Sequence, residues 1–197
     1  MQYELLLALM AFAFASSITP GPNNMMLLAS GANFGFRRTV PHMLGISIGH
    51  AFMVFLVGVG LAQMFVAFPI IKQVMQVLAA LYMLWLAWKI ANAAPTKPGD
   101  AGGEPFTFFQ AAAFQWVNPK AWGMALTAVT AYAPGDTAFA MMLVAVTFAS
   151  INLPSVSVWT VLGQQMRRFL TNPARLRAFN WTMAALLVGS LVFVFRA

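Results

Sequence analysis

The stretch Thr19-Pro20-Gly21-Pro22-Asn23-Asn24 places two prolines and a glycine inside an otherwise apolar N-terminal run. Proline has no backbone N–H and its ring clashes with the preceding turn, so a helix is predicted to break here. The stretch Asn118-Pro119-Lys120 predicts a second break in a later apolar run. Inside a bilayer each unsatisfied backbone group costs several kcal/mol, so such breaks persist only where protein or a wet cavity satisfies them. Breaks at matching positions of two halves are typical of a transporter's binding site.

The composition is that of an integral membrane protein. Of the 197 residues, 61% are hydrophobic and 8% are charged, whereas soluble domains carry about 25% charged residues. The net charge is +7, but cations in membrane proteins gather in cytoplasmic loops, so we expect no nucleic-acid partner. The absence of cysteine excludes disulfides and thiolate metal sites. Met1-Gln2-Tyr3-Glu4 lacks the basic start of a signal peptide, so the first segment is expected to be a retained helix.

Six apolar segments approach the roughly 20 residues that a spanning helix needs. They lie at about 4–28, 40–62, 69–91, 106–132, 137–162 and 178–195. We expect an all-α membrane protein with six transmembrane helices in a single domain, residues 1–197, in which helices 1 and 4 are broken at the proline motifs. A linker rich in proline and glycine at 93–105 separates two halves, about 1–92 and 106–197. Three segments in each half make the halves inverted repeats.

The first break is predicted to hold a carboxylate. Pro22 suits the first turn of a new half-helix, whose unpaired N–H groups near Asn23 and Asn24 form a positive end at membrane depth. The two asparagine side chains add neutral donors and acceptors. The alternative interpretation is a packing kink that these side chains merely satisfy.

Lys120 is predicted to carry a charge into the second break. A lysine at the centre of a membrane helix costs roughly 2.5–3.5 kcal/mol on insertion scales, which makes it a functional candidate that pairs with a substrate carboxylate. Snorkelling to an interface, or a re-entrant turn, are the alternatives. Gln115 precedes the break and is expected to face the same cavity. The predicted substrate-binding residues are Pro20, Gly21, Pro22, Asn23, Asn24, Gln115, Asn118, Pro119 and Lys120.

His50 is the candidate for proton coupling. It lies near the middle of the second segment, and histidine has an ordinary pKa of about 6.5, close to neutral pH. A hydrogen-bonded packing histidine is the alternative. The sequence offers no carboxylate for this role and no metal site, because its acids fall at segment ends or in loops. These acids are Glu4, Asp100, Glu104 and Asp136.

Two further motifs concern helix packing. Gly45 and Gly49 form a small-xxx-small face that predicts close contact with another helix. Asn152-Leu153-Pro154 is predicted to interrupt the fifth segment. This interruption either continues the polar pathway or is a kink stabilised by neighbouring serines.

These motifs together resemble the lysine exporter family of bacterial inner-membrane amino-acid efflux proteins. The resemblance rests on Ile18–Asn23, on Gly35–Arg38 with the following glycines, on Ala80–Lys89 and on Phe114–Lys120. It implies efflux of small amino acids or their derivatives, driven by the proton gradient, with the two proline motifs close together. The spelling of the first three segments is similar to that of the cysteine and O-acetylserine exporters.

The leading hypothesis is therefore a secondary active exporter of small amino acids, working by alternating access, with protons and membrane lipid as partners and without a cofactor. A transporter of another small solute or ion is the first alternative, and a non-transporting membrane assembly subunit is the second. A wet polar cavity at the breaks would favour transport, and dry packing would favour the subunit. An enzyme is not expected, since no phosphate-binding loop, zinc-protease motif or nucleophile elbow is present. A homodimer is left open.

The first prediction concerns orientation in the inner membrane. Eight cations fall in the loops of one side and two on the other, so the eight are expected in the cytoplasm and both termini in the periplasm. Reporter fusions after each segment should place Arg37–Arg38 and Arg167–Arg177 in the cytoplasm. A cytoplasmic C-terminal reporter would contradict both the segment count and the inverted repeat.

Overall fold

The computed structural model describes residues 2–61, 67–93 and 104–192, and these residues contain helices and no strand. This confirms the all-α expectation, and every expected apolar segment contains helix. The helices, in chain order, are α1 (Tyr3–Ile18), α2 (Pro22–Phe34), α3 (Phe36–Leu56), the π-helical turn η1 (Val57–Leu61), α5 (Pro69–Ala91), α6 (Phe108–Val117), α7 (Pro119–Tyr132), α8 (Ala138–Met166) and α9 (Pro173–Gly189).

Both predicted breaks are present. The axes of α1 and α2 differ by 58°, and α6 gives way to α7 at Asn118. Pro22 and Pro119 each stand at the start of the following helix. That is the position where the missing N–H of proline costs nothing and its fixed φ favours the helix.

The interruption expected at Asn152-Leu153-Pro154 is wrong, since α8 is one continuous helix of 29 residues with Pro154 in its interior. A proline inside a membrane helix is tolerated where neighbours re-satisfy the freed backbone. Here α8 packs along α1, α2 and α3, and this packing holds it continuous. The Ser155 hydroxyl also donates to the Ile151 carbonyl oxygen at 2.7 Å.

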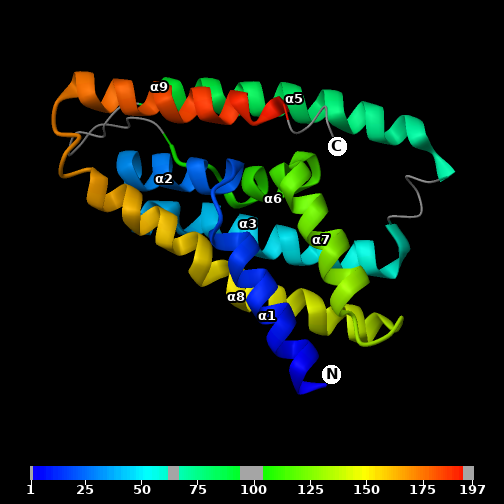
Figure 1. Cartoon of the computed structure of the whole chain (residues 1–197). Helices are drawn as coiled ribbons and strands as arrows, with labels where there is room; N and C mark the ends of the chain where they lie inside the picture. The colour runs from blue at the N-terminus through cyan, green and yellow to red at the C-terminus, as the bar shows by residue number, and fades with distance from the viewer. Residues whose placement is uncertain (1, 62–66, 94–103, 193–197) are drawn as a thin grey trace.

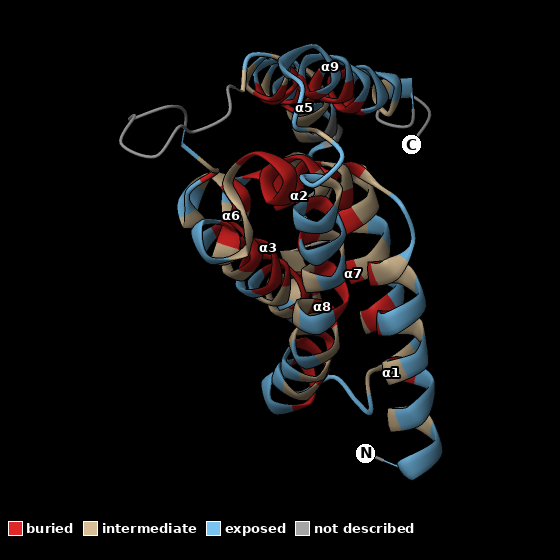
Figure 2. Cartoon of the chain, turned by 90° about the vertical axis from the view of Figure 1, so that its left-hand side faces the viewer, coloured by how far each residue is buried: buried red, intermediate tan, exposed pale blue. Residues whose placement is uncertain are grey.

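The helices form a main body and an outer pair (Figure 1). In the outer pair, α5 and α9 lie side by side and run in opposite directions, while α2 and α6 connect the pair to the body. Buried residues of α5 and α9 gather where the two helices face each other and the body (Figure 2). Met83, Leu86 and Leu187 are fully buried there. The body has its own apolar core, in which Leu9, Met53 and Phe148 are fully buried.

Glycines bring the helices of the body close together. A Cβ added at Gly163 of α8 would lie 2.1 Å from the Leu28 carbonyl oxygen of α2. On the other side, a Cβ at Gly45 would lie 2.3 Å from the Phe108 carbonyl oxygen, and one at Gly49 would lie 2.7 Å from Ala112 Cα. The predicted small-residue face of Gly45 and Gly49 is thus confirmed, and it packs on α6.

By length and apolar composition, the described residues contain three helices able to cross a membrane. These are Phe36–Leu61, Gln73–Ala91 and Ala138–Met166. The bent pair α1 and α2 makes a fourth if it counts as one span. These helices fit a multi-pass membrane protein, and the arrangement of six spans in two repeats stays a prediction.

The contact between α2 and α8 gives a stability prediction. Gly163→Ala should destabilise the protein by about 1–3 kcal/mol, because the added methyl meets backbone that cannot move aside. The measurement is the thermal unfolding midpoint in detergent. Gly123→Ala is the matched control, since a Cβ at Gly123 of α7 meets nothing within 4 Å. Equal midpoints for the two variants would contradict the close contact.

Candidate functional site

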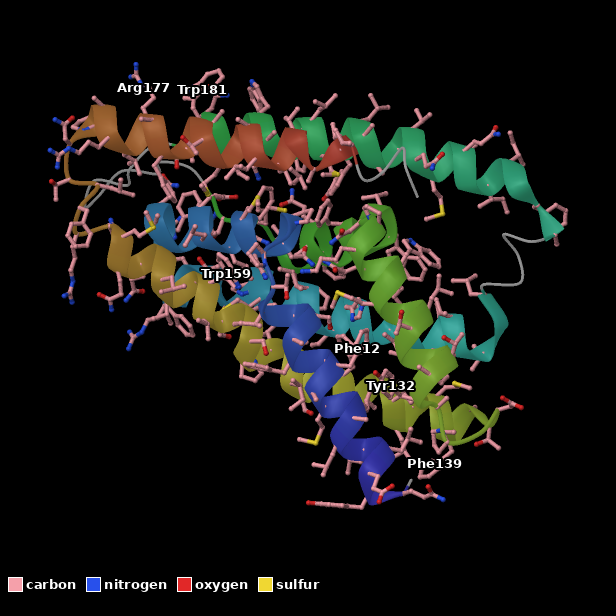
Figure 3. The ribbon with its side chains drawn as sticks, viewed as in Figure 1. Phe12, Tyr132, Phe139, Trp159, Arg177 and Trp181 are labelled. Atoms are coloured by element: carbon pink, nitrogen blue, oxygen red, sulfur yellow. The ribbon has the colours of Figure 1, made fainter. Side chains whose placement is uncertain are left out.

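The first break leaves carbonyl groups at the end of α1 without helical partners, and side chains from other elements bind them. Asn24 Nδ2 donates to the carbonyl oxygens of Ser17 and Thr19, both at 2.8 Å. Trp159 Nε1 of α8 donates to the Ile18 carbonyl oxygen at 3.1 Å, and Figure 3 shows Trp159 on α8. The break is therefore held by its own second half-helix and by a helix more than 130 residues away in the chain.

Lys120 reaches across from the second break to the first. Its Nζ donates to the Thr19 carbonyl oxygen at 2.6 Å and lies 3.4 Å from that of Pro20. The lysine side chain lies over Gly21, where a Cβ would come within 2.9 Å of Lys120 Cδ and 3.1 Å of Nζ. Gly21 is thus the residue that lets the lysine approach the broken backbone.

The second break is satisfied by neutral groups. Asn118 is the N-cap of α7, and its Oδ1 accepts from the Lys120 backbone N–H at 3.1 Å. Trp122 Nε1 donates to the Trp116 carbonyl oxygen at 2.8 Å. This hydrogen bond satisfies one of the carbonyl groups at the end of α6. The two breaks therefore differ: a side chain caps α7, whereas Gly21 at the N-cap of α2 provides none.

A pair of amides joins the two breaks. Asn23 Nδ2 donates to Gln115 Oε1 at 2.9 Å, and Gln115 Nε2 donates back to Asn23 Oδ1 at 3.2 Å. Gln115 Nε2 also donates to the Ala111 carbonyl oxygen at 2.9 Å. On the other half-helices of the two broken segments, the rings of Phe12 of α1 and Tyr132 of α7 stack with centroids 5.3 Å apart (Figure 3). Contacts between α1 and α7 and between α2 and α6 thus bring the two broken segments together at the centre of the body.

Most of the predicted site residues line one small pocket of about 20 Å³, which is room for about one water molecule. Of the predicted residues, the lining includes Gly21, Asn23, Asn24, His50, Gln115, Asn118 and Lys120. Pro20, Pro22 and Pro119 are not among the lining residues, and the prolines shape the breaks instead. A larger hollow of about 200 Å³ at the α2–α5 contact includes none of the predicted residues.

His50 is buried beside the pocket. Its Nε2 lies 3.1 Å from the Ala121 carbonyl oxygen, one residue from Lys120, so Nε2 carries the proton. The ring packs on Phe148 at a centroid distance of 4.7 Å. Its Nδ1 has no hydrogen-bond partner within the described part of the chain.

Asn152 is a pocket residue that the sequence analysis did not place in the site. Its Nδ2 donates to Ser17 Oγ at 2.8 Å, and its Oδ1 accepts from Ser47 Oγ at 2.8 Å. Asn152 thereby joins α1, α3 and α8 below the first break. The Asn-Leu-Pro motif is the sequence signal for this residue: the helix break expected there is wrong, whereas the alternative that the motif continues the polar pathway agrees with the place of Asn152 in the pocket lining.

No group of three histidine, cysteine or acidic side chains that could hold a metal ion occurs among residues 2–61, 67–93 and 104–192. The site is thus a meeting of two helix breaks, with amide and hydroxyl side chains, one ammonium and one imidazole around a small pocket.

The chain is similar to known transport proteins. The LysE type translocator family matches residues 14–196. The chain is 30% identical over 193 residues to the "Cysteine/O-acetylserine efflux protein" of Escherichia coli (strain K12) and to that of Shigella flexneri, covering 97% of this chain and 97% of each relative. No solved structure matches the chain significantly. The family is one of translocators rather than enzymes. The chain belongs to the LysE type translocator family.

Proposed function

We propose that this protein is a secondary active exporter that moves small amino acids or their derivatives from the cytoplasm to the periplasm. Membership of a translocator family and the efflux function named for its relatives support export. The observation that carries the proposal is the meeting of two broken helices at one polar pocket. A pocket that admits water favours transport over the alternative of a dry assembly subunit.

The N-terminal end of α2 is the proposed carboxylate site. No side chain caps α2, so its first N–H groups, at Asn23 and Asn24, remain available to an anion. Helix N-termini attract anions because unpaired N–H groups and the helix dipole act together. The Lys120 ammonium, with three N–H donors, lies against Gly21 at the same end. Two of these donors are directed at the carbonyl oxygens of Thr19 and Pro20, which leaves the third to bind a substrate carboxylate.

The amino group of the substrate meets neutral oxygens in this proposal. The lining offers the amide oxygens of Gln115, Asn118 and Asn152 and no carboxylate. A site of amides and one cation suits a small zwitterion better than a metal cation, which prefers anionic oxygen ligands. The side-chain amides of Asn23 and Gln115 hydrogen-bond to each other, so substrate binding would replace a hydrogen bond of this pair with one to the substrate.

The size of the pocket and the packing of the two halves support the proposal of alternating access. Space for about one water molecule is too small for an amino acid, so the helices around it must separate during transport. Contacts between α1, α2 and α8, and between α6, α7 and α3, place each broken segment against the middle helix of the other half. These contacts between the halves support the proposed inverted repeat. The symmetry is imperfect, because α9 packs on α2, the second half-helix of the first broken segment, whereas α5 packs on α6, the first half-helix of the other broken segment.

The carboxylate proposal predicts that Asn23→Leu and Pro22→Leu abolish export while membrane insertion is kept. Leucine at Asn23 removes the pair with Gln115, and leucine at Pro22 changes the first turn of α2. The measurement is uptake of labelled cysteine, O-acetylserine and other small amino acids into inverted vesicles, where export appears as accumulation. Asn92→Leu at the exposed end of α5 is the control. If both site variants transport normally, the break is a packing kink with no role in substrate binding.

Coupling is proposed to divide between His50 and Lys120. Histidine titrates near neutral pH at an ordinary pKa of about 6.5, whereas lysine starts near 10.4. His50 is therefore the proposed titrating group and Lys120 the fixed charge that binds substrate. We expect His50→Gln to change the pH profile and proton dependence of export, and Lys120→Gln to weaken substrate affinity at unchanged proton stoichiometry. An unchanged pH profile in His50→Gln would refute its role, and a changed stoichiometry in Lys120→Gln would refute the division.

A further inference from the structure

The carbonyl end of the broken first helix carries a concentrated negative potential. The last carbonyl groups of a helix have no intrahelical partner, and together they act as roughly half a negative charge. At this end Ser17, Ile18 and Thr19 each accept from a neutral side chain of Asn24 or Trp159. These donors satisfy hydrogen bonds, but they bring no positive charge.

Lys120 supplies the charge. Its Nζ lies 2.6 Å from the Thr19 carbonyl oxygen and 3.4 Å from that of Pro20. Among the described residues no other donor binds the Pro20 oxygen, and no carboxylate lies within salt-bridge distance of the Lys120 ammonium. The positive charge of this lysine is therefore balanced by backbone carbonyl groups rather than by an acid.

Carbonyl groups at the C-terminal end of a broken membrane helix are the type of site at which secondary transporters bind their coupling cation. Here a side-chain ammonium from the other half of the chain stands in that place. We propose that Lys120 is a built-in cation that occupies the carbonyl end of α1, so that this transporter needs no bound Na⁺ or K⁺ there.

Two observations favour this role over ordinary snorkelling. Lys120 points from the start of α7 to the other break rather than outward to an interface. Its aliphatic stem also crosses Gly21, where a larger residue would displace it. At the second break, the side chains that hydrogen-bond the freed backbone groups within the described part of the chain, Asn118 and Trp122, are neutral. This role of Lys120 rests on the proposed export function for its place in transport, but the contact with the α1 carbonyl groups is present in the protein without substrate.

The first experiment measures thermal unfolding of the purified protein in detergent, with no amino acid present. Lys120→Ala leaves carbonyl oxygens facing the space of the lost side chain. We expect its midpoint to fall below that of wild type and to rise saturably, by about 3 °C or more, with ethylammonium or Na⁺. Choline at the same ionic strength should not restore it, because choline has a charge but no N–H donor and is too large. Wild type should respond equally to all these salts.

Lys89→Ala is the matched control, because Lys89 contacts the rings of Trp85 and Phe106 instead of free carbonyls. It should show no preference for ethylammonium over choline. If Lys120→Ala cannot be purified, Lys120→Arg and Lys120→Met answer the same question. Both keep a long side chain and only arginine keeps the charge, so arginine should retain the wild-type midpoint more closely than methionine.

The second experiment asks whether export depends on the cation. Wild-type accumulation in inverted vesicles should be the same in Na⁺, K⁺ and choline buffers at a fixed proton gradient. Accumulation by Lys120→Ala should rise at least about threefold when ethylammonium or Na⁺ replaces choline, because the added cation would then occupy the carbonyl site in part of the molecules.

The outcomes separate this inference from the proposed function. A cation response of the substrate-free Lys120→Ala protein supports the inference even if no amino acid is transported. Export of amino acids by a wild type that requires Na⁺ would overturn the inference and leave the function intact. Equal midpoints of Lys120→Ala in ethylammonium, Na⁺ and choline would also overturn it.

Discussion

A carbonyl group freed by a broken helix has no water to bind inside a bilayer, and the arrangement of this protein follows from how those groups are satisfied. The end of α1 exposes carbonyl groups from Ser17 to Pro20. Their donors come from α2, from α7 and from α8. None of these helices can move away without leaving a carbonyl unpaired. The first break therefore fixes the relative position of three other helices and determines where the pocket lies.

The two breaks have different chemistry, although their sequences look alike. Each begins its second half-helix with proline, and each is followed by polar residues. Asn118 caps α7 with its own side chain, whereas Gly21 leaves the start of α2 uncapped. Lys120 lies on the capped helix and is bound to the uncapped break. The positive N-terminal end of α2 and the ammonium thus meet in one place, and this is the basis for proposing the first break as the anion site and the second as its support.

Close contacts of backbone on backbone make such a site possible. Gly31 and Gly163 bring α2 against α8, and Gly45 and Gly49 bring α3 against α6. Helices that approach this closely leave little empty volume, which is consistent with a pocket for about one water molecule. The amide pair of Asn23 and Gln115 is a part of that closure whose hydrogen bonds a polar ligand would replace with its own at little net cost.

The sequence by itself determined the membrane class, the helical segments, both breaks and the small-residue face of α3. Each of these follows from local chemistry: apolar length, the missing N–H of proline and the absent side chain of glycine. It also identified Asn23, Gln115 and Lys120 as polar residues in apolar surroundings. Only the tertiary structure decided what they bind, because their partners lie about 90 to 100 residues away. It also placed Asn152 in the pocket and kept α8 continuous through Pro154, since packing against three helices outweighs one missing backbone donor.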